Sequence, residues 1–187
     1  SLMSVFEIFI IAVGLSMDAF AVAICKGLSL QKADGRRAII VGLYFGIFQG
    51  IMPLIGYFVG VRFADLIMDF DHWIVFGLLL IVGLHMIHES RDSETCSTSS
   101  VKPGEMFPLA IATSIDALAV GISFALLNVE VFSAASIIAA TTFLLSAIGV
   151  QMGSVLGAKF KSKAELTGGV VLIIIGTKIL FEHLGVL

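Results

Sequence analysis

Charged residues are scarce in this 187-residue chain, at 13% of all positions, whereas hydrophobic residues make up 58%. The mean hydropathy of +1.08 lies well outside the range of soluble domains. The chain also lacks a GxxxxGKS or GxxxxGKT phosphate-binding loop, so direct use of ATP is not expected. Segments with alternating apolar and polar residues are missing too, which argues against a transmembrane barrel. These absences predict an all-helical integral membrane protein.

Six apolar runs are each long enough to cross the roughly 30 Å hydrocarbon core of a bilayer. They cover residues 4–24, 38–60, 72–88, 107–127, 131–153 and 167–184. The first run is too long for a signal peptide and carries no small-residue cleavage site. Six helices take up most of the chain and leave no room for a soluble catalytic or nucleotide-binding domain. We therefore expect a single transmembrane domain over residues 1–187.

The distribution of basic residues predicts the orientation, because lysine and arginine concentrate in cytoplasmic loops. Nine of the eleven follow the first, third and fifth apolar runs. These nine are Lys26, Lys32, Arg36, Arg37, Arg91, Lys102, Lys159, Lys161 and Lys163. Both termini should therefore lie outside, on the side of Arg62 and Lys178. Cys25 and Cys96 would then lie on the cytoplasmic side, where we expect reduced thiols without a function.

The chain contains an internal repeat. "SMDAFAVAI" at 16–24 and "SIDALAVGI" at 114–122 are identical at six of nine positions. "IGYFVG" and "IGVQMG" form a second matching pair, and "LLLIVGLHMIHE" and "VLIIIGTKILFE" form a third. The first repeat spans about 4–89, a polar cytoplasmic loop about 90–106, and the second repeat about 107–187. With three helices each, the two repeats should have inverted orientations in the membrane.

Two aspartates lie inside apolar runs at matched positions, Asp18 and Asp116. A charge at the bilayer centre costs about 2.5 to 3.5 kcal/mol on insertion scales, so such residues usually face protein or water and have a function. Small residues about one turn away would let the two helices approach closely. They are Gly14, Ala21, Ala112 and Ala119. Facing carboxylates repel unless a cation or a shared proton separates them, so we interpret the pair as a cation site rather than as partners of Ser16 and Ser114.

Further oxygen donors lie on the second and fifth runs. Gln49 and Thr142 occupy equivalent positions in the two repeats, and Thr141 precedes Thr142. Amide, hydroxyl and carboxylate oxygens suit Mn²⁺, Mg²⁺ or Ca²⁺ better than Zn²⁺ or Cu⁺. A glutamine can also join membrane helices, and a threonine hydroxyl can bond its own helix backbone. The candidate metal-binding set is therefore Asp18, Asp116, Gln49, Thr142 and Thr141.

Four segments resemble the manganese exporter family of bacterial inner membranes, within the lysine exporter superfamily. They are "GLSMDAFAVAICKG", "FGIFQGIMPLIGYFVG", "ATSIDALAVGISF" and "GGVVLIIIG", and the resemblance spans almost the whole chain. It implies a six-helix secondary transporter that exports Mn²⁺ from the cytoplasm across the inner membrane, with Mn²⁺ as substrate and no cofactor. The family's paired aspartates fall on Asp18 and Asp116, and its polar position in the second helix falls on Gln49.

Cation/proton exchange is the expected mechanism. The protein should lie in the lipid bilayer and have no nucleic-acid partner, and its oligomeric state is left open.

Two other classes of function remain. An intramembrane aspartyl protease shares a proton between two aspartates, but its YD and GxGD contexts are missing, since Met17 precedes Asp18 and Ile115 precedes Asp116. A passive divalent-cation channel is the second alternative. His85, His88 and Glu89 have a spacing that a metal could use, but at a helix end we expect them to be interfacial or solvated.

Overall fold

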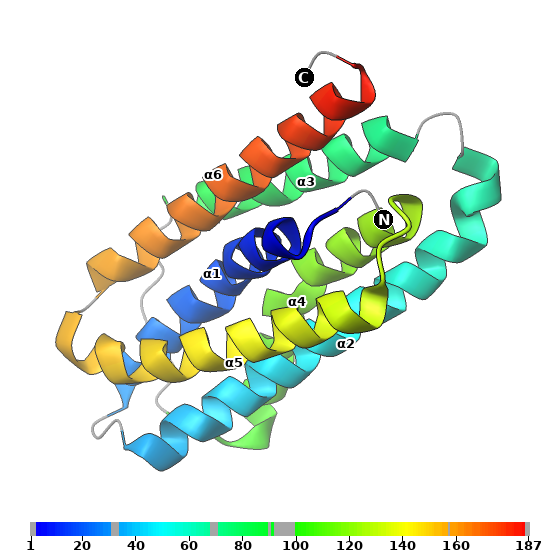
Figure 1. The fold of residues 1–187 in the computed structure, drawn as a ribbon. Helices are drawn as coiled ribbons and strands as arrows, with labels where there is room; N and C mark the ends of the chain where they lie inside the picture. The colour runs from blue at the N-terminus through cyan, green and yellow to red at the C-terminus, as the bar shows by residue number, and fades with distance from the viewer. Residues whose placement is uncertain are drawn as a thin grey trace.

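Six α-helices form an elongated bundle (Figure 1). The computed structural model describes residues 3–30, 34–67, 71–89, 91, 100–156 and 158–185. The helices are α1 (Val5–Ser29), α2 (Gly35–Ile67), α3 (Asp71–Glu89), α4 (Pro103–Leu126), α5 (Val131–Leu156) and α6 (Ala158–His183). The all-helical class predicted from the sequence is confirmed.

Three of the helices begin with a local signal that satisfies or removes a backbone N–H group of the first turn. Ser4 and Glu7 form a capping box at α1, in which each side chain accepts a hydrogen bond from the other residue's backbone N–H. Asp34 accepts from the N–H of Arg37 at the start of α2. Pro103 begins α4, where the missing N–H is not needed. These local signals explain why the helices start where the apolar runs meet polar residues.

Among the residues that the structure describes, four helices are long and apolar enough to cross a membrane: α1, α2 over Gly35–Ala64, α4, and α5 over Val131–Gly153. The apolar part of α3, His72–His88, coincides with the third expected run but is shorter than these four. α6 begins nine residues before the sixth run, ends one residue before the end of that run, and is not among the four. The chain is therefore a multi-pass membrane protein, with four of the expected six spans meeting this criterion.

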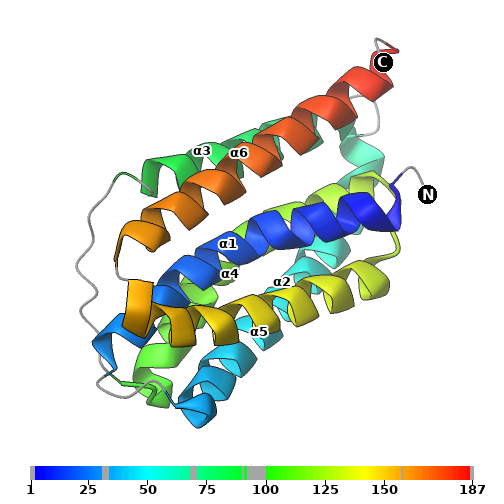
Figure 2. The ribbon, with the colours of Figure 1, turned by 60° about the vertical axis from the view of Figure 1, so that its left-hand side comes forward.

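The two halves of the chain pack through corresponding pairs of helices. α1 packs mainly against α5 and α6, while α4 packs mainly against α2 and α3; α2 also packs against α5, and α3 against α6. Direct contact between α1 and α4 is limited, and the α1–α6 contact is more extensive than the α3–α4 contact. Both chain termini lie at one end of the bundle (Figure 2). Exchanging the halves maps α1–α5 onto α2–α4 and α1–α6 onto α3–α4, and it maps α2–α5 and α3–α6 onto themselves.

Glycines bring the paired helices into close contact at matched positions. A Cβ on Gly60 of α2 would lie 3.0 Å from the carbonyl oxygen of Ile122 on α4. A Cβ on Gly153 of α5 would lie 2.1 Å from the carbonyl oxygen of Ile24 on α1. Gly56 with Leu118, and Gly149 with Phe20, form the next matched contacts. Because each residue in one contact aligns with its counterpart in the other, the internal repeat extends from sequence into packing.

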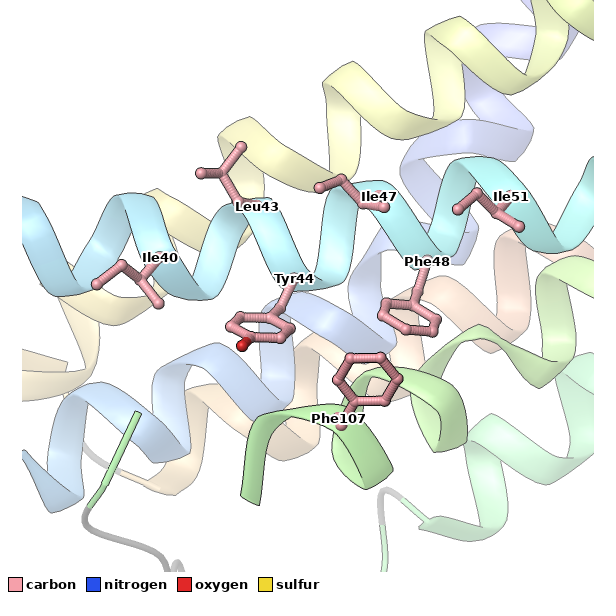
Figure 3. A pocket seen from close by; sticks show the side chains of 7 residues that line it. All are labelled: Ile40, Leu43, Tyr44, Ile47, Phe48, Ile51 and Phe107. Atoms are coloured by element: carbon pink, nitrogen blue, oxygen red, sulfur yellow. The ribbon is translucent and has the colours of Figure 1, made fainter. Parts of the chain in front are cut away.

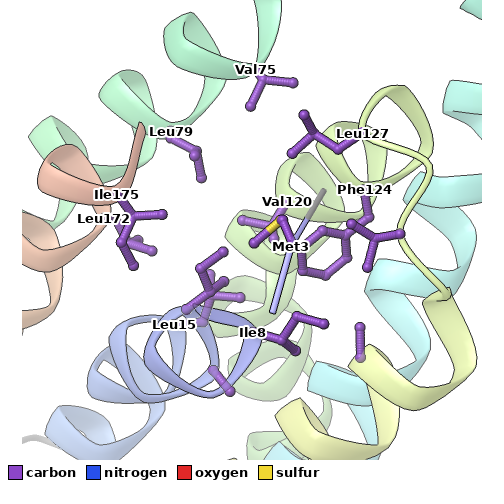
Figure 4. Packing of buried hydrophobic residues seen from close by; sticks show 14 of the residues in the cluster. Met3, Ile8, Leu15, Val75, Leu79, Val120, Phe124, Leu127, Leu172 and Ile175 are labelled. Atoms are coloured by element: carbon purple, nitrogen blue, oxygen red, sulfur yellow. The ribbon is translucent and has the colours of Figure 1, made fainter. Parts of the chain in front are cut away.

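Buried apolar side chains form two main clusters. The first cluster joins α1, α3, α4, α5 and α6 (Figure 4). Its members include Met3, Ile8, Ile11, Leu15, Val75, Leu79, Met86, Ala117, Val120, Phe124, Ile138, Leu172 and Ile175. The second cluster joins α1, α2, α4 and α5 and consists of Ala19, Ala23, Leu30, Ala38, Val41, Phe45, Met106, Ala110 and Val150. Both clusters draw on α1, α4 and α5, so these helices pass from one to the other.

Each end of α1 is fixed by an ion pair. At its start Glu7 pairs with Lys178 of α6. Near its end Lys26 is 1% exposed, and its ammonium donates to the carbonyl oxygen of Ser100 at 2.7 Å and to a carboxylate oxygen of Glu105 at 3.4 Å. Its neighbour Cys25 is disulfide-bonded, so the expectation of a reduced thiol is wrong for that residue. Cys96 lies outside the described residues.

Candidate functional site

The candidate metal-binding residues lie at one level of the bundle. Each of these residues has, on its own helix, a residue of the first apolar cluster (or one packed against it) on one side. On its other side the helix contributes a residue to the second apolar cluster. The flanking residues are Leu15 and Ala19 for Asp18, Ala117 and Ala110 for Asp116, Met52 and Phe45 for Gln49, and Ile138 and Val150 for Thr142. Four helices therefore contribute polar side chains to one layer between two apolar regions.

Gln49 reaches from α2 to the backbone of α1. Its side chain is 1% exposed, and its amide nitrogen donates to the carbonyl oxygen of Leu15 at 3.1 Å. If the amide were flipped, its oxygen would face the carbonyl oxygen of Leu15, and two acceptors would meet. The contact therefore requires the amide nitrogen to face α1. The amide oxygen is buried without a hydrogen-bond partner. An unsatisfied buried acceptor costs about 1–3 kcal/mol, and a bound cation would remove that cost.

Thr142 reaches α1 from α5. It is fully buried, and its hydroxyl lies 2.9 Å from that of Ser16. The Ser16 hydroxyl donates to the carbonyl oxygen of Ala12 at 2.5 Å, which uses its single hydrogen. Thr142 must therefore donate to Ser16, and its remaining lone pairs stay available as acceptors. One turn further along α5, the hydroxyl of Ser146 is also buried without a hydrogen-bond partner.

Asp18 lies on α1 one turn after these contacts and is 9% exposed. It follows Gly14 by four positions and Leu15 by three, so it shares a helix face with both. A Cβ on Gly14 would lie 3.2 Å from the side chain of Leu172 on α6, whereas the carbonyl of Leu15 accepts from Gln49. Asp18 therefore lies one turn after two contacts of α1, the packing of Gly14 against α6 and the hydrogen bond from Gln49 of α2 to Leu15.

Asp116 has a different neighbourhood. Its side chain is 17% exposed, and one carboxylate oxygen lies 4.0 Å from Nδ1 of His85 on α3. His85 itself is half exposed. We expected this histidine to be interfacial or solvated at a helix end; its exposure agrees with that expectation, and it also lies beside a candidate ligand. The histidine and carboxylate join α3 and α4 at the level of the polar layer.

The structure thus brings Gln49 and Thr142 to adjacent residues of α1, one turn from Asp18. It places Asp116 beside His85, while direct α1–α4 contact is limited. The meeting of the two carboxylates stays a prediction. Thr141 is partly exposed and lies about 100° around the helix from Thr142, so of the two threonines Thr142 has the better position.

Sequence reasoning did not select Ser146 or His85 as members of the site. Ser146 follows Thr142 by four positions, so helical spacing alone could have placed both hydroxyls on one face of α5. No comparable signal was available for His85, because its proximity to Asp116 depends on how α3 packs against α4. Ser16 was considered only as a partner of Asp18 and instead holds Thr142.

The atoms in this layer that could bind a metal ion are mostly oxygens. Within the part of the chain that the structure describes, no group of three or more histidine, cysteine, aspartate or glutamate side chains is placed to hold a metal ion. A cation here would therefore use amide, hydroxyl or backbone oxygens in addition to carboxylates. Such mixed oxygen sites suit hard divalent cations, which bind oxygen ligands and do not require thiolates.

These features define a multi-pass helical membrane protein with a polar layer buried between apolar clusters. The family described as "Putative manganese efflux pump" matches residues 32–180. The chain is 53% identical to the "Putative manganese efflux pump MntP" of Acetivibrio thermocellus, covering 99% of this chain and 94% of that protein. It is 55% identical to MntP of Desulfitobacterium hafniense, covering 97% and 96%. The chain therefore belongs to the manganese efflux pump family.

The family resemblance inferred from the four sequence segments is thus confirmed. A third relative, MntP of Mannheimia succiniciproducens, is 50% identical over 97% of this chain and 98% of its own length. No solved structure matches this chain. The family description names a transport protein, which disfavours the protease alternative.

Proposed function

We propose that this protein exports Mn²⁺ from the cytoplasm across the bacterial plasma membrane as a secondary transporter. Family membership supports the transported ion. The observation that carries the proposal is the buried Gln49 amide oxygen, which has no partner and lies in the same layer as Asp18 and the Thr142 hydroxyl. These oxygens could replace part of the hydration shell of a hard cation in the middle of the bundle.

The matched helix contacts support an inverted repeat. Each half has three helices, so equivalent helices run in opposite directions across the membrane. On this proposal both termini lie outside, and the three connections rich in basic residues face the cytoplasm. Movement of one half against the other would open the polar layer first to one side and then to the other.

Cation/proton exchange follows from the carboxylates. A hard divalent cation binds ionised oxygens, so Mn²⁺ and protons compete for Asp18 and Asp116. In the proposed cycle Mn²⁺ from the cytoplasm displaces protons, the halves alternate, and protons from outside replace the released metal. Because bound protons exclude Mn²⁺ from the site, the protein returns to the cytoplasm-facing form without carrying Mn²⁺ back.

Calorimetry tests this exchange. Mn²⁺ binding to the purified protein should release protons, measured as a heat that changes with the ionisation enthalpy of the buffer. Binding should tighten as pH rises, because fewer protons must then be displaced. The Asp18→Asn/Asp116→Asn double variant should show neither effect. Binding to the wild type without proton release would contradict the exchange mechanism, and Mn²⁺ flux only down its gradient would indicate a channel.

The proposed orientation predicts the location of the loops. Reporter fusions within residues 25–37 and 89–106 should be cytoplasmic, because these segments carry most of the basic residues. Fusions at either terminus should report the outside. A cytoplasmic C-terminus would refute the inverted-repeat topology.

A further inference from the structure

An apolar groove runs along the outer face of α2 beside the start of α4 (Figure 3). It is lined by α2 residues between Ile40 and Ile51 and by Phe107 of α4, and has a volume of about 540 Å³. Its lining side chains are aliphatic and aromatic, and the Tyr44 hydroxyl is the one polar group among them. We call it the α2–α4 groove. It lies apart from the polar layer, since none of the candidate metal-binding residues lines it.

Aromatic packing gives the groove its shape. The Phe107 ring meets the Phe48 ring edge-on, with centroids 5.1 Å apart and planes at 80°. Tyr44 packs on Phe107 in the same manner, at 6.3 Å and 76°. Along the same helix, Leu43 and Ile47 are 47% and 53% exposed. The rings therefore form one wall of the groove, and exposed aliphatic side chains form the other.

Basic residues flank one end of the groove. Arg36 is exposed in the first turn of α2 and precedes Ile40 by four positions and Leu43 by seven, which places all three on one helix face. Exposed Lys102 immediately precedes α4 and its groove residue Phe107. Of the nearby acidic groups, Asp34 caps α2 and Glu105 pairs with buried Lys26. Arg37 adds a further positive charge, so this end has a positive balance.

The length of the groove matches one leaflet of a bilayer. From Ile40 to Ile51 the helix rises about 16 Å at 1.5 Å per residue, which is about half of the roughly 30 Å hydrocarbon core. Arg36 and Lys102 then fall at headgroup level when the groove lies in the hydrocarbon. On the proposed orientation this is the cytoplasmic leaflet, where anionic lipids attract basic residues next to membrane helices.

We infer that the α2–α4 groove binds an anionic phospholipid, with one acyl chain against Phe48 and Phe107 and the phosphate beside Arg36 and Lys102. The combination of an apolar slot and a positive rim distinguishes this occupant from a second copy of the chain, which would need no charge at one end. The inference does not depend on which ion is transported.

Titration of the delipidated full-length protein in detergent with phosphatidylglycerol, followed by native mass spectrometry, tests the site. Phosphatidylglycerol should bind more tightly than phosphatidylcholine, and glycerol 3-phosphate, which lacks chains, should not bind. Arg36→Gln should weaken phosphatidylglycerol binding about fivefold, and Arg36→Gln/Lys102→Gln about twenty-five-fold, from about 1 kcal/mol per basic residue. Arg62→Gln, at an exposed position near the other end of α2, should leave binding unchanged.

Filling the groove provides a second test. Ile47→Trp should block the acyl chain and reduce binding at least tenfold, whereas Ile55→Trp, at a similarly exposed position of α2 outside the groove, should not. Equal binding of both lipids, or equal losses in the paired variants, would overturn the inference. A lipid-free dimer that Ile47→Trp converts to monomers would also overturn it, by assigning the groove to an interface between copies.

Discussion

Asp18→Asn and Asp116→Asn should each reduce Mn²⁺ export by about two orders of magnitude, because losing even a residue that only supports a metal ligand costs about 10–100-fold. Asparagine keeps the shape of the side chain but replaces one acceptor oxygen with an NH2 donor and removes the negative charge that a divalent cation needs. A neutral side chain is also cheaper to bury in a membrane helix than a charged one, so both variants should fold. The double variant should be little worse than either single variant, because the two carboxylates act as a unit.

Export from proteoliposomes loaded with Mn²⁺, with protein amount and folding measured in parallel, checks this prediction. Asp34→Asn is the matched control, because the exposed Asp34 only caps α2 and asparagine caps a helix equally well. Gln49→Ala should weaken export less than either aspartate variant, since it removes a neutral ligand. Full export by Asp18→Asn or Asp116→Asn would refute the assignment of that residue to the site.

Gly56→Ala should destabilise the protein by about 1–3 kcal/mol, the usual cost of overpacking. A Cβ at this position would lie 2.1 Å from the carbonyl oxygen of Leu118, so α2 and α4 would have to separate. Gly153→Ala should have a similar effect between α5 and α1, because its Cβ would lie 2.1 Å from the carbonyl oxygen of Ile24. Both clashes are with backbone, which cannot rotate away as a side chain can.

Gly77→Ala provides the control for helix propensity. Nothing lies within 4 Å of a Cβ at this α3 position, and alanine is favoured over glycine in a helix interior by about 1 kcal/mol. This variant should therefore be as stable as the wild type or more so. Thermal unfolding in detergent, followed by far-ultraviolet circular dichroism, compares the three variants. A Gly56→Ala protein as stable as Gly77→Ala would show that α2 and α4 are not in close contact.

The helices and their repeat could be predicted from the sequence because their signals are local. The third expected run, 72–88, and the fifth, 131–153, coincide with the apolar parts of α3 and α5. Hydrophobic length is a property of one segment, as is the match between the two aspartate motifs. The family assignment also depended on short contiguous segments, and it was confirmed.

The partners of the site residues could not be predicted in this way. The Ser16–Thr142 contact, the Gln49 bond to the backbone of α1 and the approach of His85 to Asp116 each depend on two helices that are distant in sequence. Between membrane helices such contacts follow from the shapes of small side chains rather than from a hydrophobic pattern. The burial of Lys26 was equally unpredictable, because it depends on Ser100 and Glu105 beyond the third helix.

The unequal contacts of α6 with α1 and of α3 with α4 bear on the resting state of the transporter. If the two halves exchange conformations during transport, the extensive contact in one state becomes the sparse contact in the other. The free-energy difference between inward-open and outward-open forms would then arise only where the halves differ in sequence. Gly14 against Leu172 is one such place, because its counterpart in the second half is Ala112. Gly14→Ala would make the two halves more alike. It would therefore shift the population away from the form with the extensive α1–α6 contact and toward the form that opens to the other side of the membrane.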